Sequence, residues 1–137
     1  MRLEFFTLVQ NFLALAPNAT ATATVQVPSD AAFVWTHAHY MGDVAAAGQT
    51  DSTRIIPLVT MYFQNGASGR NLSNVVTAQN GIPISSMFGG QVPLALPKPL
   101  FFAANSYINL GVFNYDAAQT YNLRLALIGY KQFPEGV

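Results

Sequence analysis

Eight residues near the start of the chain, TATATVQV at positions 20–27, alternate without a break between two kinds of side chain. Threonine or glutamine occupies every even position, and alanine or valine occupies every odd position. A period of two is that of a β-strand with one face buried and the other facing water. Residues 107–114 and 121–130 alternate in a similar way. These three segments predict a fold built from half-buried strands.

Further segments of strand character lie between them. Residues 33–41 are rich in aromatic and β-branched side chains, and in a regular strand their odd and even positions would occupy opposite faces. Residues 54–64 form another candidate strand, in which Pro57 indicates an edge or a start. The small-residue connection that follows residue 41 has room for one helical turn at 44–47.

The spacing of these segments predicts the fold class. Roughly six to eight short strands with turns about ten residues apart are typical of an all-β sandwich or a small barrel. Because this length suits eight strands, we expect an all-β, antiparallel β-sandwich of the jelly-roll type. Residues 1–18 precede the alternating pattern. We therefore expect an N-terminal arm at 1–18 and a single jelly-roll domain at 19–137.

Composition excludes several classes of protein. Of 137 residues, 51% are hydrophobic, 9% are charged and none is cysteine, and the net charge is zero. Soluble domains usually carry about 25% charged residues. Six dispersed cations do not form a nucleic-acid-binding patch, and a chain without cysteine has no disulfide scaffold. A neutral, sparsely charged surface favours association with other proteins.

The apolar run near the N-terminus is too short to span a bilayer, which needs about 20 residues. Its polar interruption at Gln10 and Asn11, and Pro17 after the small-residue end, argue against a cleaved signal peptide. We therefore expect no membrane partner and a run that packs on another protein surface. The side chains expected at a partner interface, here and in the next aromatic segment, are Leu3, Phe5, Phe6, Leu8, Phe12, Leu13, Trp35 and Tyr40.

Two histidines offer the chain's one candidate metal site. On a strand, His37 and His39 project from the same face about 7 Å apart, and Asp43 could add a carboxylate. The pair is similar to the His-x-His start of the cupin family. Cupins, however, carry a glutamate where this chain has an aspartate, and they use a third histidine that this chain lacks. We therefore expect no metal and no cofactor.

No arrangement of residues favours catalysis. No serine lies in a nucleophile elbow, and most carboxylates lie in turns, where aspartate is favoured structurally. We expect a protein that is not an enzyme and has no small-molecule substrate. An alternative is a carbohydrate-binding jelly roll with an aromatic platform. The aromatic residues available for such a platform are Trp35, Tyr40, Tyr62, Tyr107, Tyr115 and Tyr121.

From about residue 19 onward, the order of the motifs resembles that of small jelly-roll cement or decoration proteins on the capsids of tailed phages. The motifs are the alternating strand at 19–27 with SDAAFVW at 29–35, SGRNLS at 68–73, PLFF at 99–102, SYINL at 106–110 and YNLRLALIGYK at 121–131.

The resemblance implies a structural virion protein on the outer surface of a capsid. Such proteins form dimers or trimers that span neighbouring copies of the major capsid protein, which would be the partner. An alternative within the virion is a head-fibre or tail subunit.

Overall fold

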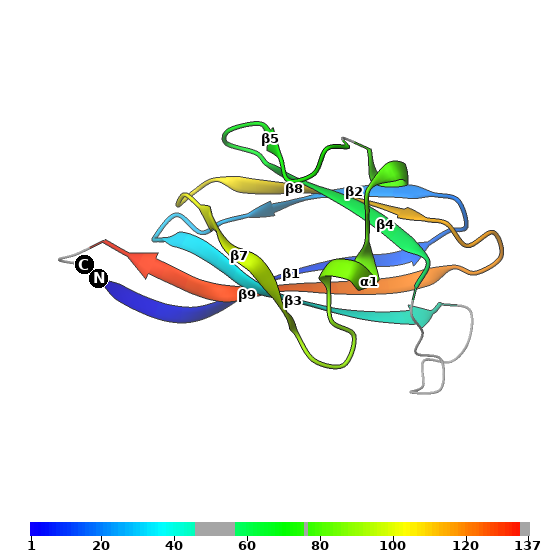
Figure 1. Ribbon diagram of the computed structural model, residues 1–137, viewed down its shortest axis with the longest axis horizontal. Coiled ribbons are helices and arrows are strands. Elements are labelled where there is room, and N and C mark those ends of the chain that lie inside the picture. Colours follow the sequence, from blue (N-terminus) through cyan, green and yellow to red (C-terminus); the bar gives the residue numbers. More distant parts are fainter. Residues whose placement is uncertain (46–56, 76, 135–137) are drawn as a thin grey trace.

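The structure is a computed structural model that describes residues 1–45, 57–75 and 77–134. Two antiparallel sheets face each other as separate layers (Figure 1). The first sheet has the strand order β1 (Arg2–Leu15), β9 (Tyr121–Phe133), β3 (Ala32–Val44) and β7 (Leu94–Phe102). The second has the order β2 (Thr20–Gln26), β8 (Tyr107–Asn114), β4 (Val59–Asn65) and β5 (Arg70–Asn71), and β6 (Ile82–Pro83) also pairs with β4.

The strand pairs are nested. β1 pairs with β9, β2 with β8, β3 with β7, and β4 with β5. The chain is therefore a long hairpin folded over on itself, which is the jelly-roll arrangement. This confirms the predicted all-β sandwich. The short helical pieces, a 3-10 helix at Ala78–Asn80 and α1 (Ile84–Met87), lie in the connection between β5 and β7. Within the described residues, no helix has the length and apolarity that crossing a membrane requires.

The space between the sheets is filled by large apolar side chains. Trp35 and Phe63 have ring centroids 5.2 Å apart, and Phe88 lies 5.9 Å from Phe63 in a stacked arrangement. Along β9, Leu123, Leu125 and Leu127 are buried, while the residues between them face outward. The period-two pattern of the sequence therefore places one face of each strand in a single core.

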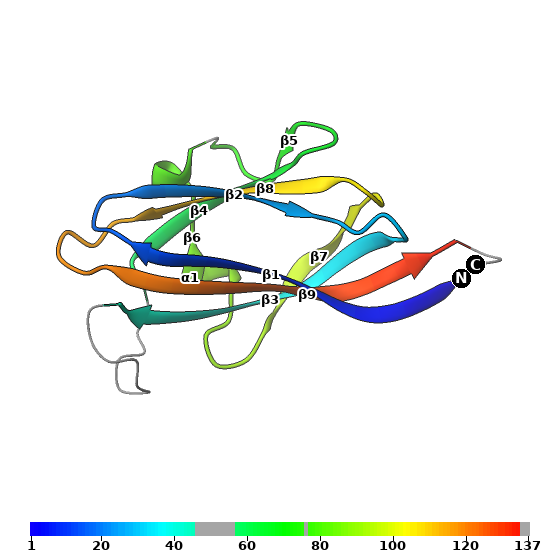
Figure 2. The same cartoon turned by 180° about the vertical axis from the view of Figure 1, so that it is seen from behind.

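The N-terminal segment differs from the arm expected at residues 1–18. Arg2–Leu15 is a strand of the sandwich itself, and its pairing with β9 runs from Arg2 opposite Phe133 to Leu15 opposite Tyr121. The start of β1 and the end of β9 lie side by side at one end of the molecule (Figure 2). The physical reason is alternation: Leu8 and Phe12 enter the core, so the segment is part of the domain.

A β-bulge changes the expected faces of β3. The register with β9 shifts between Trp35 and His37, with Thr36 as the extra residue. Trp35 therefore points into the core, whereas His37 points outward, although a regular strand would place both on one face. The Trp35 Nε1 donates to the His37 carbonyl at 2.7 Å, and the Thr36 hydroxyl donates to the Ile128 carbonyl at 3.1 Å. These two hydrogen bonds stabilise the bulge.

The remaining expectations are met in part. β7 contains Pro97 and Pro99 and lies at the edge of its sheet, where a missing N–H disrupts no ladder. β4 begins at Val59, and the earlier positions 54–56 of the expected strand lie outside the described residues. The helical turn expected at 44–47 also falls largely outside them, and Val44 itself ends β3.

Candidate partner interface

The outer face of the β1–β9–β3–β7 sheet is unusually apolar for a solvent-facing surface. On β1, even-numbered side chains such as Leu8 and Phe12 enter the core, so the odd-numbered ones face outward. Phe5 is 79% exposed, and Leu3, Val9 and Leu13 are each more than half exposed. Exposed apolar surface of this continuity marks interaction sites in soluble proteins.

One row of apolar side chains crosses all four strands. Phe5 lies opposite Tyr130, Tyr130 lies opposite Val34, and Val34 lies opposite Phe101. Phe101 is 58% exposed, so both ends of the row project from the face. We call this the aromatic row. Aromatic side chains are enriched at the centres of protein interfaces because they combine large contact area with few rotatable bonds.

The face becomes polar toward the opposite end. The next two rows place Thr7, Ile128, His37 and Ala95 together, and then Val9, Ala126 and His39. Beyond them lie two rows that contain Asn11, Arg124 and Met41, and then Asn122 and Asp43. The charged residues Arg124 and Asp43 therefore lie in neighbouring rows at the end farthest from the aromatic row.

The outer face of the second sheet is polar by contrast. Thr24 lies opposite Asn109, and Asn109 lies opposite Gln64. The Thr24 hydroxyl donates to the side-chain Oδ1 of Asn109 at 3.1 Å, and the side-chain Nδ2 of Asn109 donates to Oε1 of Gln64 at 2.9 Å. We call this the amide row. Its polar groups are satisfied by one another, so this face needs no partner to complete its hydrogen bonds.

Of the side chains predicted at a partner interface, Leu3, Phe5 and Leu13 lie on the outer face. Trp35 and Tyr40 are corrections, because 0% and 5% of their surfaces are exposed and both lie in the core. Burial also raises the pKa of the Tyr40 hydroxyl above its ordinary value.

Three further predicted interface side chains lie on the inner face of β1. Leu8 and Phe12 are core residues with 6% exposure each, so they are also corrections. Phe6 is half-buried, with its ring edge-on to Phe33 at 6.2 Å and the Lys131 ammonium 4.4 Å from its centroid. Leu8 and Phe12 therefore hold the domain together and are not available to a partner.

The candidate metal residues share a face but not a site. His37 and His39 occupy consecutive outward positions on β3, as the sequence predicts. Asp43 is four residues beyond His39, or about 13 Å along the strand, which is too far for a shared ion. Among the described residues, no three His, Cys, Asp or Glu side chains are grouped so that they could hold a metal. His37 Nδ1 lies 2.9 Å from the Thr36 hydroxyl.

The aromatic platform of the carbohydrate alternative is not assembled. Trp35, Tyr40 and Tyr121 are buried in the core. Tyr107 and Tyr115 are exposed but lie at opposite ends of β8, where Tyr107 begins the strand and Tyr115 follows its last residue. The Tyr115 hydroxyl is also engaged by the Gln79 carbonyl. These side chains do not form one stacking surface for a sugar ring.

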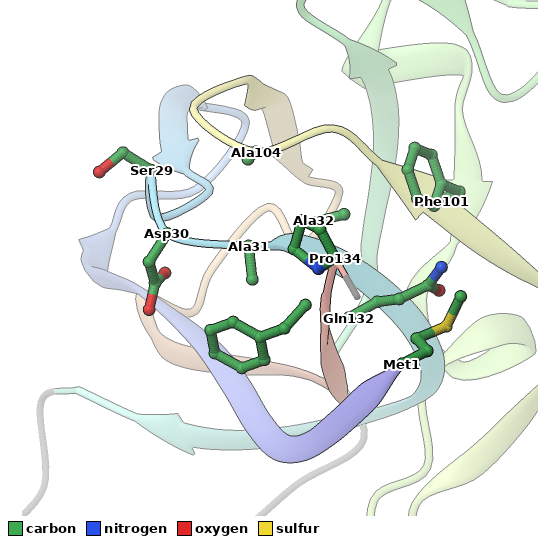
Figure 3. Close-up of a pocket in the computed structure, with 10 residues that line it drawn as sticks. Met1, Ser29, Asp30, Ala31, Ala32, Phe101, Ala104, Gln132 and Pro134 are labelled. Carbon is green, nitrogen blue, oxygen red and sulfur yellow. The ribbon is translucent and has the colours of Figure 1, made fainter. Parts of the chain in front are cut away.

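A hollow of about 370 Å³ lies at the aromatic end of the outer face. Figure 3 shows Met1, Gln132 and Phe101 around it, with Ala32 and Pro134 between them. A second, more apolar groove runs beside β7 and is lined by Leu72, Ile82, Met87, Leu94, Leu96 and Leu100, among others. The hollow therefore lies beside Phe101, at one end of the aromatic row.

Four residues of the outer face were not among the interface side chains predicted from the sequence, namely Val9, Phe101, Ile128 and Tyr130. The signal for three of them was available: strict alternation on β1 and β9 assigns Val9, Ile128 and Tyr130 to the side opposite the core leucines. Phe101 carried a weaker signal, because the prolines before it hid the strand that gives it an outward direction.

Comparison with known proteins gives little further assignment. No protein-family profile and no curated protein matches the chain. Among solved structures, the fold is similar to a chain of a "Cyanophage Pam1 capsid asymmetric unit", with 20% sequence identity and a TM-score of 0.47. The similarity covers 96% of this chain and 85% of that chain.

Proposed function

We propose that the protein is a non-enzymatic structural subunit of a virion, a cement or decoration protein that binds the outside of a phage capsid. The observation that carries the proposal is the apolar outer face of the β1–β9–β3–β7 sheet. In a monomer without partners, the exposed Phe5 and Phe101 would contribute nothing to stability. A subunit whose face is covered by neighbours gains stability from the same residues.

The resemblance of the sequence motifs to jelly-roll cement proteins supports the choice of a phage capsid as the assembly. The large extended strands suit this role, because β1, β3 and β9 are each 13 or 14 residues long and form a broad platform. The partner we propose is the major capsid protein, and the location we propose is the outer surface of the shell.

The mechanism requires binding and no reactive residue. A protein that binds the assembled shell but not its separated subunits stabilises the assembled state by mass action. When the concentration of free cement protein is about 100 times its dissociation constant for the shell, this stabilisation is about 2.7 kcal/mol per site. Contacts with two neighbouring capsid subunits raise the overall affinity for the shell. Once the first contact has formed, the second forms within the same complex and at a high effective concentration.

Mixing the purified protein with undecorated shells of its own phage tests the proposal. We expect the protein to sediment with the shells and to raise the temperature at which they release their DNA. Failure of the wild type to sediment with shells, or to change their thermal stability, would contradict the proposal.

A further inference from the structure

The outer face of the β1–β9–β3–β7 sheet is complementary to itself. We propose that this face binds the same face of a second copy of the chain, around a twofold axis that runs parallel to the strands between β9 and β3. The inference rests on the proposed function of a subunit in an assembly, and it names a second copy, instead of the major capsid protein, as the neighbour that covers the apolar face. It leaves the remaining surface of the dimer to contact the shell.

The size of the face matches what a stable dimer needs. Strands β1, β9 and β3, each about 43 Å long and spaced about 4.8 Å apart, cover about 620 Å², and the shorter β7 adds about 140 Å². The total, about 760 Å², is close to the roughly 800 Å² that each partner of a standard protein–protein interface buries. Two such sheets pack about 10 Å apart, with their side chains interdigitated.

The proposed axis places each row over its own counterpart. A rotation about this axis exchanges β9 with β3 and β1 with β7, and each row keeps its position along the strands. In the aromatic row, Phe5 then lies over Phe101 of the second copy, and Tyr130 lies over Val34 of the second copy. Apolar side chains therefore meet apolar side chains throughout this row.

The same rotation brings opposite charges together. Arg124 on β9 lies over Met41 of the second copy, and the next outward position on that strand is Asp43. Consecutive outward positions are about 7 Å apart, which is within reach of an arginine side chain. Each dimer therefore contains two Arg124–Asp43 contacts between copies, one on each side of the axis.

An axis across the strands gives a much poorer match. It would place the aromatic row over the row of the other copy that holds Asn11, Arg124 and Met41. Phe5 and Phe101 would then bury charged and amide groups without partners, which costs free energy for each group. Complementarity therefore favours the axis parallel to the strands.

The first test is the oligomeric state of the purified chain without shells, measured by sedimentation equilibrium up to about 100 µM, a range that detects micromolar affinity. We expect a dimer for the wild type and for Thr22→Asp, which alters the opposite sheet. We expect Phe5→Asp and Phe101→Asp to raise the dimer dissociation constant at least about tenfold, as for other buried aromatic anchors. Because both side chains are largely exposed in the single chain, these substitutions spare its core.

The second test is cross-linking, which reports the orientation of the two copies. The chain has no cysteine, so each introduced thiol is unique. A Phe5→Cys variant mixed with a Phe101→Cys variant should be joined between copies by a bifunctional maleimide that spans about 10 Å, which is the spacing of two packed sheets and too wide for a direct disulfide. Phe5→Cys alone should not, because the two Phe5 positions lie over opposite edges of the sheet, about 14 Å apart at three strand spacings.

The third test is charge reversal. Arg124→Asp alone and Asp43→Arg alone should each weaken the dimer, and the double variant should restore its affinity. A monomeric or trimeric wild type, a maleimide cross-link between two Phe5→Cys chains, or no restoration in the double variant would overturn the inference. A monomer that still binds shells would refute the dimer alone. A dimer that does not bind shells would refute the proposed function alone.

Discussion

Asn114 joins the two turns at one end of the sandwich, and its removal should be costly. Its side chain is fully buried at the end of β8. The Nδ2 group donates to the carbonyls of Leu15 at 3.1 Å, Ala16 at 3.2 Å and Gln119 at 2.9 Å, and Oδ1 accepts from the Asp116 amide at 2.8 Å. One amide therefore connects the β1–β2 turn to the β8–β9 turn.

The cost of Asn114→Ala follows from these four contacts. A net hydrogen bond contributes about 1 kcal/mol, and a buried group left without a partner costs about 1–3 kcal/mol. Water reaches the exposed turn residues Ala16 and Gln119 more easily than Leu15, so part of the loss is recovered there. We therefore expect a loss of about 3 kcal/mol. That is a large share of the about 5–15 kcal/mol that stabilises a typical domain.

Urea unfolding followed by tryptophan fluorescence measures this loss, since Trp35 is the chain's one tryptophan and lies in the core. Asn109→Ala is a matched control on the same strand, because Asn109 belongs to the amide row on the outer face and should cost less than about 1 kcal/mol. Asn114→Asp replaces the amide donor by an oxygen that faces three carbonyls, so it should destabilise the protein at neutral pH at least as much as Asn114→Ala. Equal losses at the two asparagines, or a tolerated aspartate, would refute the reasoning.

Four further predictions concern other parts of the sandwich. Burial, and then the hydrogen bond to Asp116, raise the pKa of Tyr121 to about 12 from 10.0. The folded state therefore favours the neutral phenol, so the wild type should lose stability between pH 10 and pH 12. Tyr121→Phe should lose less over the same range. Urea unfolding at several pH values measures both losses. The Tyr121 hydroxyl, followed by backbone amides, lowers the pKa of Asp116, so its stabilisation should be present above the ordinary aspartate value of 3.8 and disappear as pH falls through the lowered one. Asp116→Asn should remove this acid dependence. Deletion of Thr36 should leave the folded state intact by circular dichroism, because the pairs on either side of the bulge then join in one continuous register with β9. By contrast, Trp35→Ala should cost about 3–5 kcal/mol in thermal unfolding, because it leaves a large cavity in the core.

The sequence predicted those elements in which hydrophobic alternation is unbroken. β2 and β8 run almost where the alternating segments indicate, and β9 extends that pattern to Phe133. β1 was missed as a member of the sheet because Gln10 points inward among apolar residues, which blurs the period, while outward Phe5 and Val9 make the segment look apolar throughout. Alternation is informative only when the two faces of a strand meet different environments.

The candidate interface was less predictable, for a local reason. A single extra residue at Thr36 reverses the direction of every following side chain on β3 relative to a regular strand. Trp35 therefore became a core residue, and His37 and His39 moved to the outer face. No residue type at this position indicates a bulge when only one sequence is read. The close approach of Gly129 is a consequence, since a Cβ there would lie 1.8 Å from the Val34 carbonyl oxygen.

The low charge of the chain has a structural location that bears on its function. The ion pairs Lys131–Asp30 and Arg2–Glu4 lie at the end of the sandwich where β1 begins, and Arg124 and Asp43 lie toward the other end. Between them, the middle of the outer face presents apolar side chains, Thr7 and two histidines. On the outer face itself, Arg124 and Asp43 place charge at one end, beyond the apolar middle. Such a face gives little protection against random hydrophobic contacts. It does specify one orientation, because only a partner in the correct register pairs these charges and buries the aromatic row at the same time. This combination suits a subunit that must form one defined contact, and charge placed across the middle would oppose that contact.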